Sequence, residues 1–371
     1  MKIQKSLVIS LIILATTNCE KKPQQKQTAL LAKSEIVLDH LDNIFSNFSL
    51  STKKSGKDSI IVYDAKTDRF GFFNLQEQRL TGFIPIEREG PNFMDFPLID
   101  FEFRNNQLFV LSDAYFSIFD SNGKLIRRYT NADFDDLFSD QRISDFEFLN
   151  PHQIVFIHTH MDFVYGKANS IKEDYTLFSI LDLSNRSFET LDFEMPEELT
   201  NSSEEGYIQD YIFPTFEIVE KKAIYSFPFS ADIYVADLSN QSISIQTPEI
   251  SLINTARDKV NKDIFGSSDW IPYVYSSVKY SELAYDPESK NFAQVANDFT
   301  RDSSGNPKNT KYLFVYDESL NLLSEEEIEE RIMEPAIFTN HKILLQKSMS
   351  VQTTEEGTEF IKYTIKAPGK P

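Results

Sequence analysis

A unit of four short predicted strands recurs along this 371-residue chain and limits the folds that it can adopt. The clearest copy covers residues 100–129, where the segment Asp100 to Phe103 alternates polar and apolar side chains and a later turn has the sequence Asp-Ser-Asn-Gly. Short strands joined by Asn, Asp and Gly turns predict an antiparallel meander. Further units start near residues 44, 145, 215, 282 and 336, and the last of them lacks a fourth strand.

The first predicted strand, residues 35–40, has no partner nearby in the sequence. Placed beside the last unit, it supplies the missing strand and closes a ring, which leaves only short and protected strand edges. We therefore predict an all-β protein: a six-bladed β-propeller over residues 35–366, closed by an N-terminal strand that completes the last blade, with residues 367–371 as a tail. Two β-sandwich domains are the alternative, although no Pro- or Gly-rich linker divides the chain.

Three local predictions accompany this fold. Residues 53–57 are predicted to form a turn in the first unit. Residues 256–264 are predicted to form a short helix within the largest insert. Residues 324–331 are predicted to form an acidic helical turn, with Ser324 as its N-cap and Glu327 in the capping-box position.

The N-terminus has the pattern of a secretory signal. Lys2 and Lys5 precede an apolar run at residues 7–15 that is too short to span a bilayer, and Cys19, the single cysteine, follows it. This resembles a bacterial lipoprotein signal, although Thr16 and Asn18 depart from the usual residues. We predict a signal peptide at residues 1–18 and a lipid-bearing Cys19 on a flexible tether, residues 19–34. A plain secretory signal with a chance cysteine is the alternative.

Charge excludes some partners. The net charge of −20 repels phosphate backbones and acidic headgroups, so we expect no nucleic-acid partner. An acylated Cys19 leaves no thiol for a disulfide in the folded part. We predict that the lipid anchors the protein in the outer membrane, facing the periplasm. Display on the cell surface is the alternative. We expect a monomer.

The predicted connections within and between units are unequal in length. Most long ones join second to third strands or one unit to the next, and in a four-stranded blade both kinds emerge on one face. Candidate ligand-binding residues on these loops are Arg88, Tyr207, Asp210, Tyr211, Trp270, Tyr273 and Tyr275. Local pairing of Arg88 with flanking Glu residues, a solvated acidic loop around Asp210, and a Trp270 loop that covers the core are the structural alternatives.

One pattern of residues suits a metal site. His158, His160 and Asp162 share parity at the end of a predicted strand, so their side chains can point the same way. Two imidazoles and a carboxylate suit zinc or another divalent transition metal. Solvated polar side chains at a strand end are the simpler interpretation, and we expect no other cofactor.

Some motifs resemble a known family. The segment Glu89-Gly90-Pro91-Asn92, a following Asp-Phe strand, and the turn from Phe119 to Lys124 resemble the TolB-like, six-bladed propeller lipoproteins of domain of unknown function 4221. Arg88 and Asn92 depart from positions where such propellers often have Gly. The resemblance implies the fold and is silent on activity.

The sequence has no Gly-x-Ser-x-Gly elbow, no phosphate-binding Gly loop and no His-Glu-x-x-His motif. We predict a membrane-anchored, non-enzymatic propeller that binds a protein, peptide or glycan through its long-loop face. The alternative is a hydrolase or lyase that acts on glycans or peptides through loop carboxylates, with or without the metal.

Overall fold

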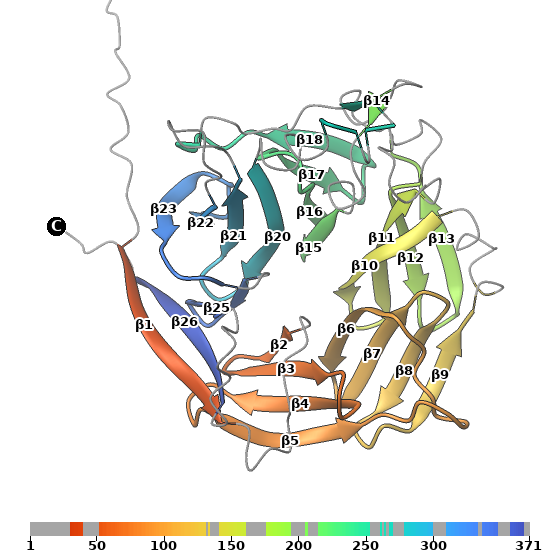
Figure 1. The fold of residues 1–371 in the computed structure, drawn as a ribbon. Coiled ribbons are helices and arrows are strands. Elements are labelled where there is room, and N and C mark those ends of the chain that lie inside the picture. Colours follow the sequence, from red (N-terminus) through yellow and green to blue (C-terminus); the bar gives the residue numbers. More distant parts are fainter. Residues whose placement is uncertain are drawn as a thin grey trace, which may run out of the picture.

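The computed structural model is an all-β ring of six blades (Figure 1). The residues that the structure describes are 30–39, 52–130, 133, 141–160, 176–193, 205–206, 214–252, 260–261, 263–264, 267–269, 278–299, 309–332, 336–347 and 357–366. Within this part of the chain, no helix is long and apolar enough to cross a membrane.

Each of the first three blades is an antiparallel sheet of four consecutive strands. Blade 1 contains β2 (Thr52–Gly56), β3 (Ser59–Asp64), β4 (Arg69–Asn74) and β5 (Arg79–Pro85). Blade 2 contains β6 (Leu98–Arg104), β7 (Gln107–Ser112), β8 (Phe116–Asp120) and β9 (Leu125–Tyr129). Blade 3 contains β10 (Gln141–Asn150), β11 (Gln153–His160), β12 (Phe178–Asp182) and β13 (Ser187–Leu191).

The remaining three blades follow the same pattern, with one exception in the last. Blade 4 contains β15 (Thr215–Val219), β16 (Lys222–Ser226), β17 (Ile233–Asp237) and β18 (Ser242–Gln246). Blade 5 contains β20 (Val278–Asp286), β21 (Asn291–Asp298), β22 (Thr310–Tyr316) and β23 (Leu322–Ile328). Blade 6 contains β24 (Ile337–Thr339), β25 (Lys342–Gln346), β26 (Gly357–Lys366) and the N-terminal strand β1 (Leu30–Asp39).

The N-terminal strand closes the ring, as the sequence predicted. β1 pairs antiparallel with β26 along its whole length, with Val37 opposite Glu359 and Lys33 opposite Tyr363. Asp39 also pairs with Arg79 of β5, which links the last blade to the first. Ile36 and Leu38 of β1 are buried. The predicted six-bladed propeller is therefore confirmed.

The hydrophobic core lies between neighbouring blades. One cluster of buried apolar side chains occupies each of the six interfaces between adjacent blades. Phe101, Phe146 and Phe216 occupy equivalent places on the innermost strands of three blades and are buried in these interfaces. Because strand residues alternate in direction, their polar neighbours point toward the axis of the ring.

Asp and Asn side chains carry many of the turns, which explains how a chain with 11 Gly residues makes so many. In the turn after β8, Asp120 Oδ1 accepts hydrogen bonds from the backbone N–H groups of Asn122 and Lys124. Asp182 and Asp237 accept equivalent bonds in blades 3 and 4. These turns join third to fourth strands.

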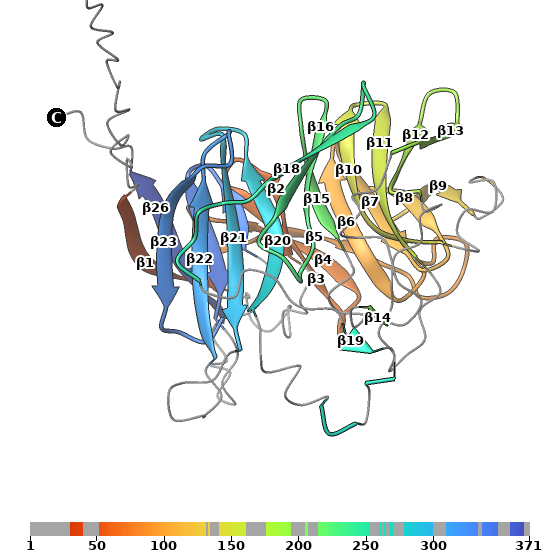
Figure 2. The same ribbon diagram turned by 90° about the horizontal axis from the view of Figure 1, so that it is seen from above.

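The ring has two distinct faces (Figure 2). Turns from first to second strands and from third to fourth strands emerge on one face, which we call the short-turn face. The opposite face, which receives the connections from second to third strands and from blade to blade, is the long-loop face. A small extra ribbon pairs β14 (Glu205–Gly206) with β19 (Val260–Asn261).

Three local predictions were wrong. Most of the predicted turn at residues 53–57 is strand β2, whereas residues 44–50, predicted as that strand, lie outside the described residues. The predicted helical turn at residues 324–331 is mostly strand β23, because pairing with β22 and burial of Ser324 and Ile328 override local helix propensity. Within the predicted helix at residues 256–264, Val260–Asn261 forms the ribbon strand β19.

Candidate ligand-binding channel

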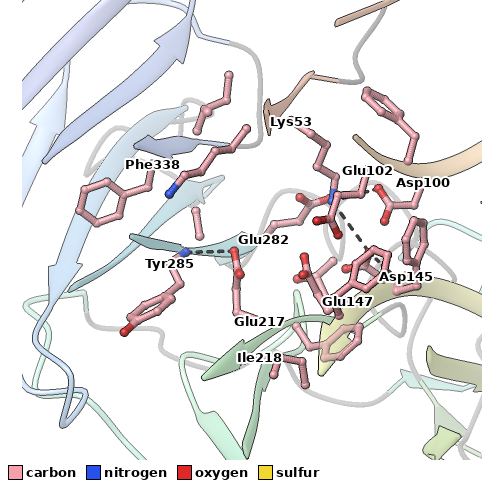
Figure 3. Close-up of a pocket in the computed structure, with 18 of the residues that line it drawn as sticks. Lys53, Asp100, Glu102, Asp145, Glu147, Glu217, Ile218, Glu282, Tyr285 and Phe338 are labelled. Carbon is pink, nitrogen blue, oxygen red and sulfur yellow. Dashed lines mark hydrogen bonds and ion pairs between the residues drawn. The ribbon is translucent and has the colours of Figure 1, made fainter. Parts of the chain in front are cut away.

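A cavity of about 520 Å³ lies on the axis of the propeller. The innermost strands of all six blades contribute to its wall. Acidic side chains dominate its polar lining, and they gather around the Lys53 side chain in Figure 3. The acidic members of the lining are Asp100, Glu102, Asp145, Glu147, Glu217 and Glu282, and the basic members are Lys53, Lys54 and Arg104.

Three acidic residues at equivalent positions of β6, β10 and β20, namely Asp100, Asp145 and Glu282, form what we call the deep layer. Lys53 Nζ lies 2.9 Å from Asp100 Oδ1 and 3.8 Å from Asp145 Oδ1. Burial by itself lowers the pKa of Lys53, but the surrounding carboxylates outweigh burial and hold that pKa well above its usual value. Lys53 is therefore a fixed positive charge at the centre of the deep layer.

Asp145 is the deep-layer carboxyl group that burial affects most clearly. Burial raises the pKa of Asp145 well above its usual range, against the opposing charge of Lys53. A side-chain hydrogen bond with Asp100 raises it further, because such a bond between two carboxyl groups requires a shared proton. The deep layer thus combines the Lys53 ammonium group with an Asp145 carboxyl group that favours its protonated form.

Glu102, Glu147 and Glu217 form the outer layer, two residues further along β6 and β10 and at the equivalent place on β15. No ion pair reaches these three side chains within the part of the chain that the structure describes. Glu217 Oε1 accepts a hydrogen bond from the Tyr285 backbone N–H at 3.0 Å (Figure 3). Glu102 Oε2 is buried and has no hydrogen-bond partner among the described residues.

The outer-layer carboxyl groups resist ionisation. Burial raises the pKa of Glu102 to about 7 and that of Glu217 to about 7. Burial also raises the pKa of Glu147 well above its usual value, and the charges of Glu217 and Glu102 add to that shift. Near neutral pH this layer holds protons that a bound cation would displace.

The cavity lies at the short-turn end of the axis. Its lining includes Gly56, Arg104 and Pro287, which lie at or just beyond the ends of the innermost strands where the chain turns toward the second strands. The Arg104 guanidinium stacks over the Phe148 ring, 4.7 Å from its centroid. The axial cavity therefore has an acidic interior, and the stacked pair of Arg104 and Phe148 lies near its short-turn end.

Contacts between blades 5, 6 and 1 hold β2 at the channel wall. The buried Asp286 carboxylate accepts hydrogen bonds from the backbone N–H groups of Asn340 and His341, and Lys54 Nζ lies 3.5 Å from it. Thr339 Oγ1 donates a hydrogen bond to the Lys57 carbonyl oxygen at 2.8 Å. These bonds fix the strand that carries Lys53.

Comparison with known proteins identifies the family. The sequence profile of the domain of unknown function DUF4221 matches residues 28–327. The chain belongs to this family. A crystal structure of a DUF4221 member from Bacteroides vulgatus superposes with a TM-score of 0.71 at 14% identity, covering 92% of this chain and 99% of that one.

A second solved structure shares the fold of this DUF4221 protein. It is a Bacteroides fragilis protein described as exported, with a TM-score of 0.57 and 12% identity, covering 91% of this chain and 96% of that one. At such low sequence identities, the two structures are evidence for the fold only. No curated protein matches the sequence.

Arg88 is the one predicted ligand-binding residue that the structure describes. Its guanidinium forms two hydrogen bonds of 2.6 Å with the Asp68 carboxylate and stacks over the Phe96 ring at 4.5 Å. Arg88 therefore pairs with Asp68, a turn residue of blade 1, and not with the flanking Glu residues that the sequence suggested as partners. Arg88 is not part of the axial cavity.

The other predicted site residues lie where the structure gives no description. They are Cys19, Asp162, Tyr207, Asp210, Tyr211, Trp270, Tyr273 and Tyr275. Their predicted roles stay predictions.

The predicted metal ligand His158 is fully buried. Its Nε2 atom lies 2.6 Å from Ser179 Oγ, and burial lowers its pKa to about 3. His160 ends β11, and its side chain lies outside the described atoms, as does Asp162. Among the described residues, no group of three or more His, Cys, Asp or Glu side chains is arranged to hold a metal ion.

The sequence contains a signal for the cavity in the same segments that predicted the fold. The repeat Asp-Phe-Glu-Phe at Asp100 and Asp145 places two carboxylates per strand on one side, with Phe on the other. Once those strands are known to be innermost, the carboxylates must face the axis. Lys53 was missed because its strand was predicted to be a turn.

Proposed function

We propose that this DUF4221 protein is a lipid-anchored, non-enzymatic binding protein of the cell envelope whose axial cavity receives a basic side chain of a peptide or protein. The observation that carries the proposal is the outer layer of Glu102, Glu147 and Glu217, which lines a cavity of about 520 Å³ and forms no ion pair among the described residues. That volume admits a lysine or arginine side chain.

The chemistry of the channel favours a cation over other ligands. A buried carboxylate is stabilised by an ammonium or guanidinium group that donates charge-assisted hydrogen bonds. The net charge of −20 over the whole chain attracts basic partners at long range and repels acidic ones. Lys53 already pairs with Asp100 and Asp145 in the deep layer, so the outer layer is where an added positive charge gains most.

The sequence supports the envelope location. An apolar run of signal-peptide length precedes Cys19, and a protein of the same fold from Bacteroides fragilis is described as exported. Stable membrane attachment through Cys19 requires more than one acyl chain.

Calorimetric titration with a trilysine peptide tests the binding site. The double variant Glu147→Gln with Glu217→Gln should weaken binding by at least roughly tenfold, because it removes two carboxylates from the outer layer. The pair Glu189→Gln with Glu327→Gln removes the same number of carboxyl groups from exposed strand positions outside the cavity, and it should bind like the wild type. A triglutamate peptide serves as the negative control.

The number of protons released on binding is a second quantity that the same titration measures. Trilysine should release protons from the outer layer, so the observed heat should change with the ionisation enthalpy of the buffer. If trilysine produces no binding heat, or if both double variants bind trilysine with equal affinity, the proposal that the axial cavity binds basic side chains is wrong.

One observation favours an enzyme as a second candidate. Glu102 and Glu217, with pKa values of about 7, are suited to general acid–base catalysis on a glycan or peptide. Turnover of chromogenic glycosides or peptides by the wild type, lost in Glu102→Gln and retained in Glu189→Gln, would replace the binding function with this one.

A further inference from the structure

The polypeptide enters the propeller at the short-turn face. Leu30, the first residue of β1, pairs with Lys366 at the end of β26. The neighbouring Ile365 N–H donates a hydrogen bond of 3.0 Å to the carbonyl oxygen of His341, in the turn between β24 and β25. This turn joins a first to a second strand and therefore lies on the short-turn face. In Figure 2 the arrowhead of β26 points to the side that carries the β12–β13 turn.

The acidic cavity lies at the same face. Gly56 and Pro287, at the ends of β2 and β20 near their first turns, belong to its lining. The outer layer of Glu102, Glu147 and Glu217 is nearer to this face than the deep layer, because it follows the deep layer along strands that run toward the first turns. The site and the entry point of the chain are thus on one side of the ring.

The covalent distance from Leu30 to the predicted anchor is short. Ten residues separate Cys19 from Leu30, so even a fully extended chain spans at most roughly 40 Å between them. The long-loop face is separated from Leu30 by the whole length of β1, whose ten residues end at Asp39. A lipid on Cys19 would therefore be tethered to the short-turn face of the ring.

We propose that the axial cavity faces the membrane that holds the anchor, and that its partner is a basic segment of a protein held in that same membrane. This inference rests on the proposed function. A segment that protrudes from the bilayer is already concentrated beneath the cavity, whereas a large soluble protein must enter a gap of limited height. Anionic headgroups are excluded as ligands by the acidic lining, because like charges repel.

Two single-cysteine variants in blade 2 test the orientation. Ser121 and Ala114 are exposed and lie in the turns at opposite ends of β8, Ser121 on the short-turn face and Ala114 on the long-loop face. Cys19 is the only natural cysteine, so in the acylated protein Ser121→Cys and Ala114→Cys each carry one free thiol. The measurement labels that thiol with a fluorophore on lipidated protein in vesicles whose headgroups carry a quencher.

We expect stronger quenching of the label in Ser121→Cys than of the label in Ala114→Cys. Equal quenching, or stronger quenching in Ala114→Cys, overturns the orientation while leaving the binding site intact. Wild-type protein should float with the vesicles and Cys19→Ala protein should not. Failure of the wild type to float would refute the anchoring, and the orientation with it.

Access to the cavity gives an independent measurement. Trilysine should bind the vesicle-anchored protein and the unanchored Cys19→Ala protein with the same affinity. Trilysine fused to a large globular carrier should bind the anchored protein several-fold more weakly than the unanchored one. Equal affinity of the carrier fusion for both proteins would contradict a cavity that faces the membrane.

Discussion

At the scale of single residues, this propeller places acidic side chains on its axis and compensates for them in two ways. Lys53 neutralises the deep layer directly, at 2.9 Å from Asp100. The outer layer forms no ion pair among the described residues, and burial favours the protonated form of its carboxyl groups. Protonation in the folded state links stability to pH.

Glu102→Gln should flatten the pH dependence of stability. The pKa of Glu102 rises from 4.5 to about 7 on folding, chiefly through burial, so between these values the folded state binds a proton that the unfolded state has lost. The resulting stabilisation is fully present below the unfolded pKa and is lost as pH rises through 7. The amide does not ionise, so we expect the variant to be more stable than the wild type at pH 8, by up to about 3 kcal/mol, and similar at pH 5.

Urea denaturation at four pH values between 5 and 8 measures this difference. Glu189→Gln, on an exposed strand position, is the control and should follow the wild type at every pH. A constant difference between Glu102→Gln and the wild type across the range would show that ionisation of Glu102 is unrelated to stability.

Lys53→Met should destabilise the fold by about 3–5 kcal/mol at pH 8, because it leaves Asp100 and Asp145 without their shared cation. Lys57→Met is the matched control: Lys57 is 63% exposed and pairs with Glu288 at 3.2 Å, so its loss should cost less than about 1 kcal/mol. Equal losses for both variants in chemical denaturation would argue against a special role of Lys53.

At the scale of elements, turns and strands lock one blade against the next. The turn after β8 approaches β5 of the neighbouring blade so closely that Gly123 has no room for a side chain. Gly123 has φ +80°, a region that other residues rarely adopt, and an added Cβ would overlap the Pro85 carbonyl oxygen. The Asp-Ser-Asn-Gly turn is thus also an interface between blades 1 and 2.

Gly123→Ala should lower the free energy of unfolding by roughly 2 kcal/mol or more, because both the backbone conformation and the contact with Pro85 become strained. Gly82→Ala is the comparison: it lies within β5, no atom lies within 4 Å of the place that its new Cβ would take, and it should be neutral or slightly stabilising. Thermal unfolding of the two variants measures the contrast. If Gly82→Ala is as harmful as Gly123→Ala, close packing at the turn is not the reason.

At the scale of the whole molecule, the ring is closed twice between the last and first blades. On the outside, β1 completes blade 6 and meets β5 through Asp39 and Arg79. Nearer the axis, Asp58 of blade 1 accepts hydrogen bonds from Asn340 and Lys342 of blade 6. Closure of this kind protects strand edges that would otherwise pair with other molecules.

A chain that begins after β1, at residue 40, should lose the outer closure and expose the edge of β26. We expect a large loss of stability and concentration-dependent self-association, because Ile36 and Leu38 leave the core between blades 6 and 1. Light scattering after size-exclusion chromatography measures the association. A synthetic peptide of residues 30–39 added in trans should restore the monomer, and a shortened chain that stays monomeric without it would contradict the role of β1.

The repeated Asp-Phe-Glu-Phe segments, the Asp-based turns and the unpaired N-terminal strand were sufficient to predict the propeller and its closure, because strand periodicity and turn chemistry are local properties. The axial cavity was not predictable in the same way. Asp100, Glu147 and Glu217 are far apart in the sequence, and only the ring brings their strands to a common axis. Lys53 was hidden because a short polar strand looks like a turn until β3 pairs with it. The sequence by itself determined the blades; the tertiary structure decided which of their side chains meet, since contacts across the axis depend on how all six blades are placed.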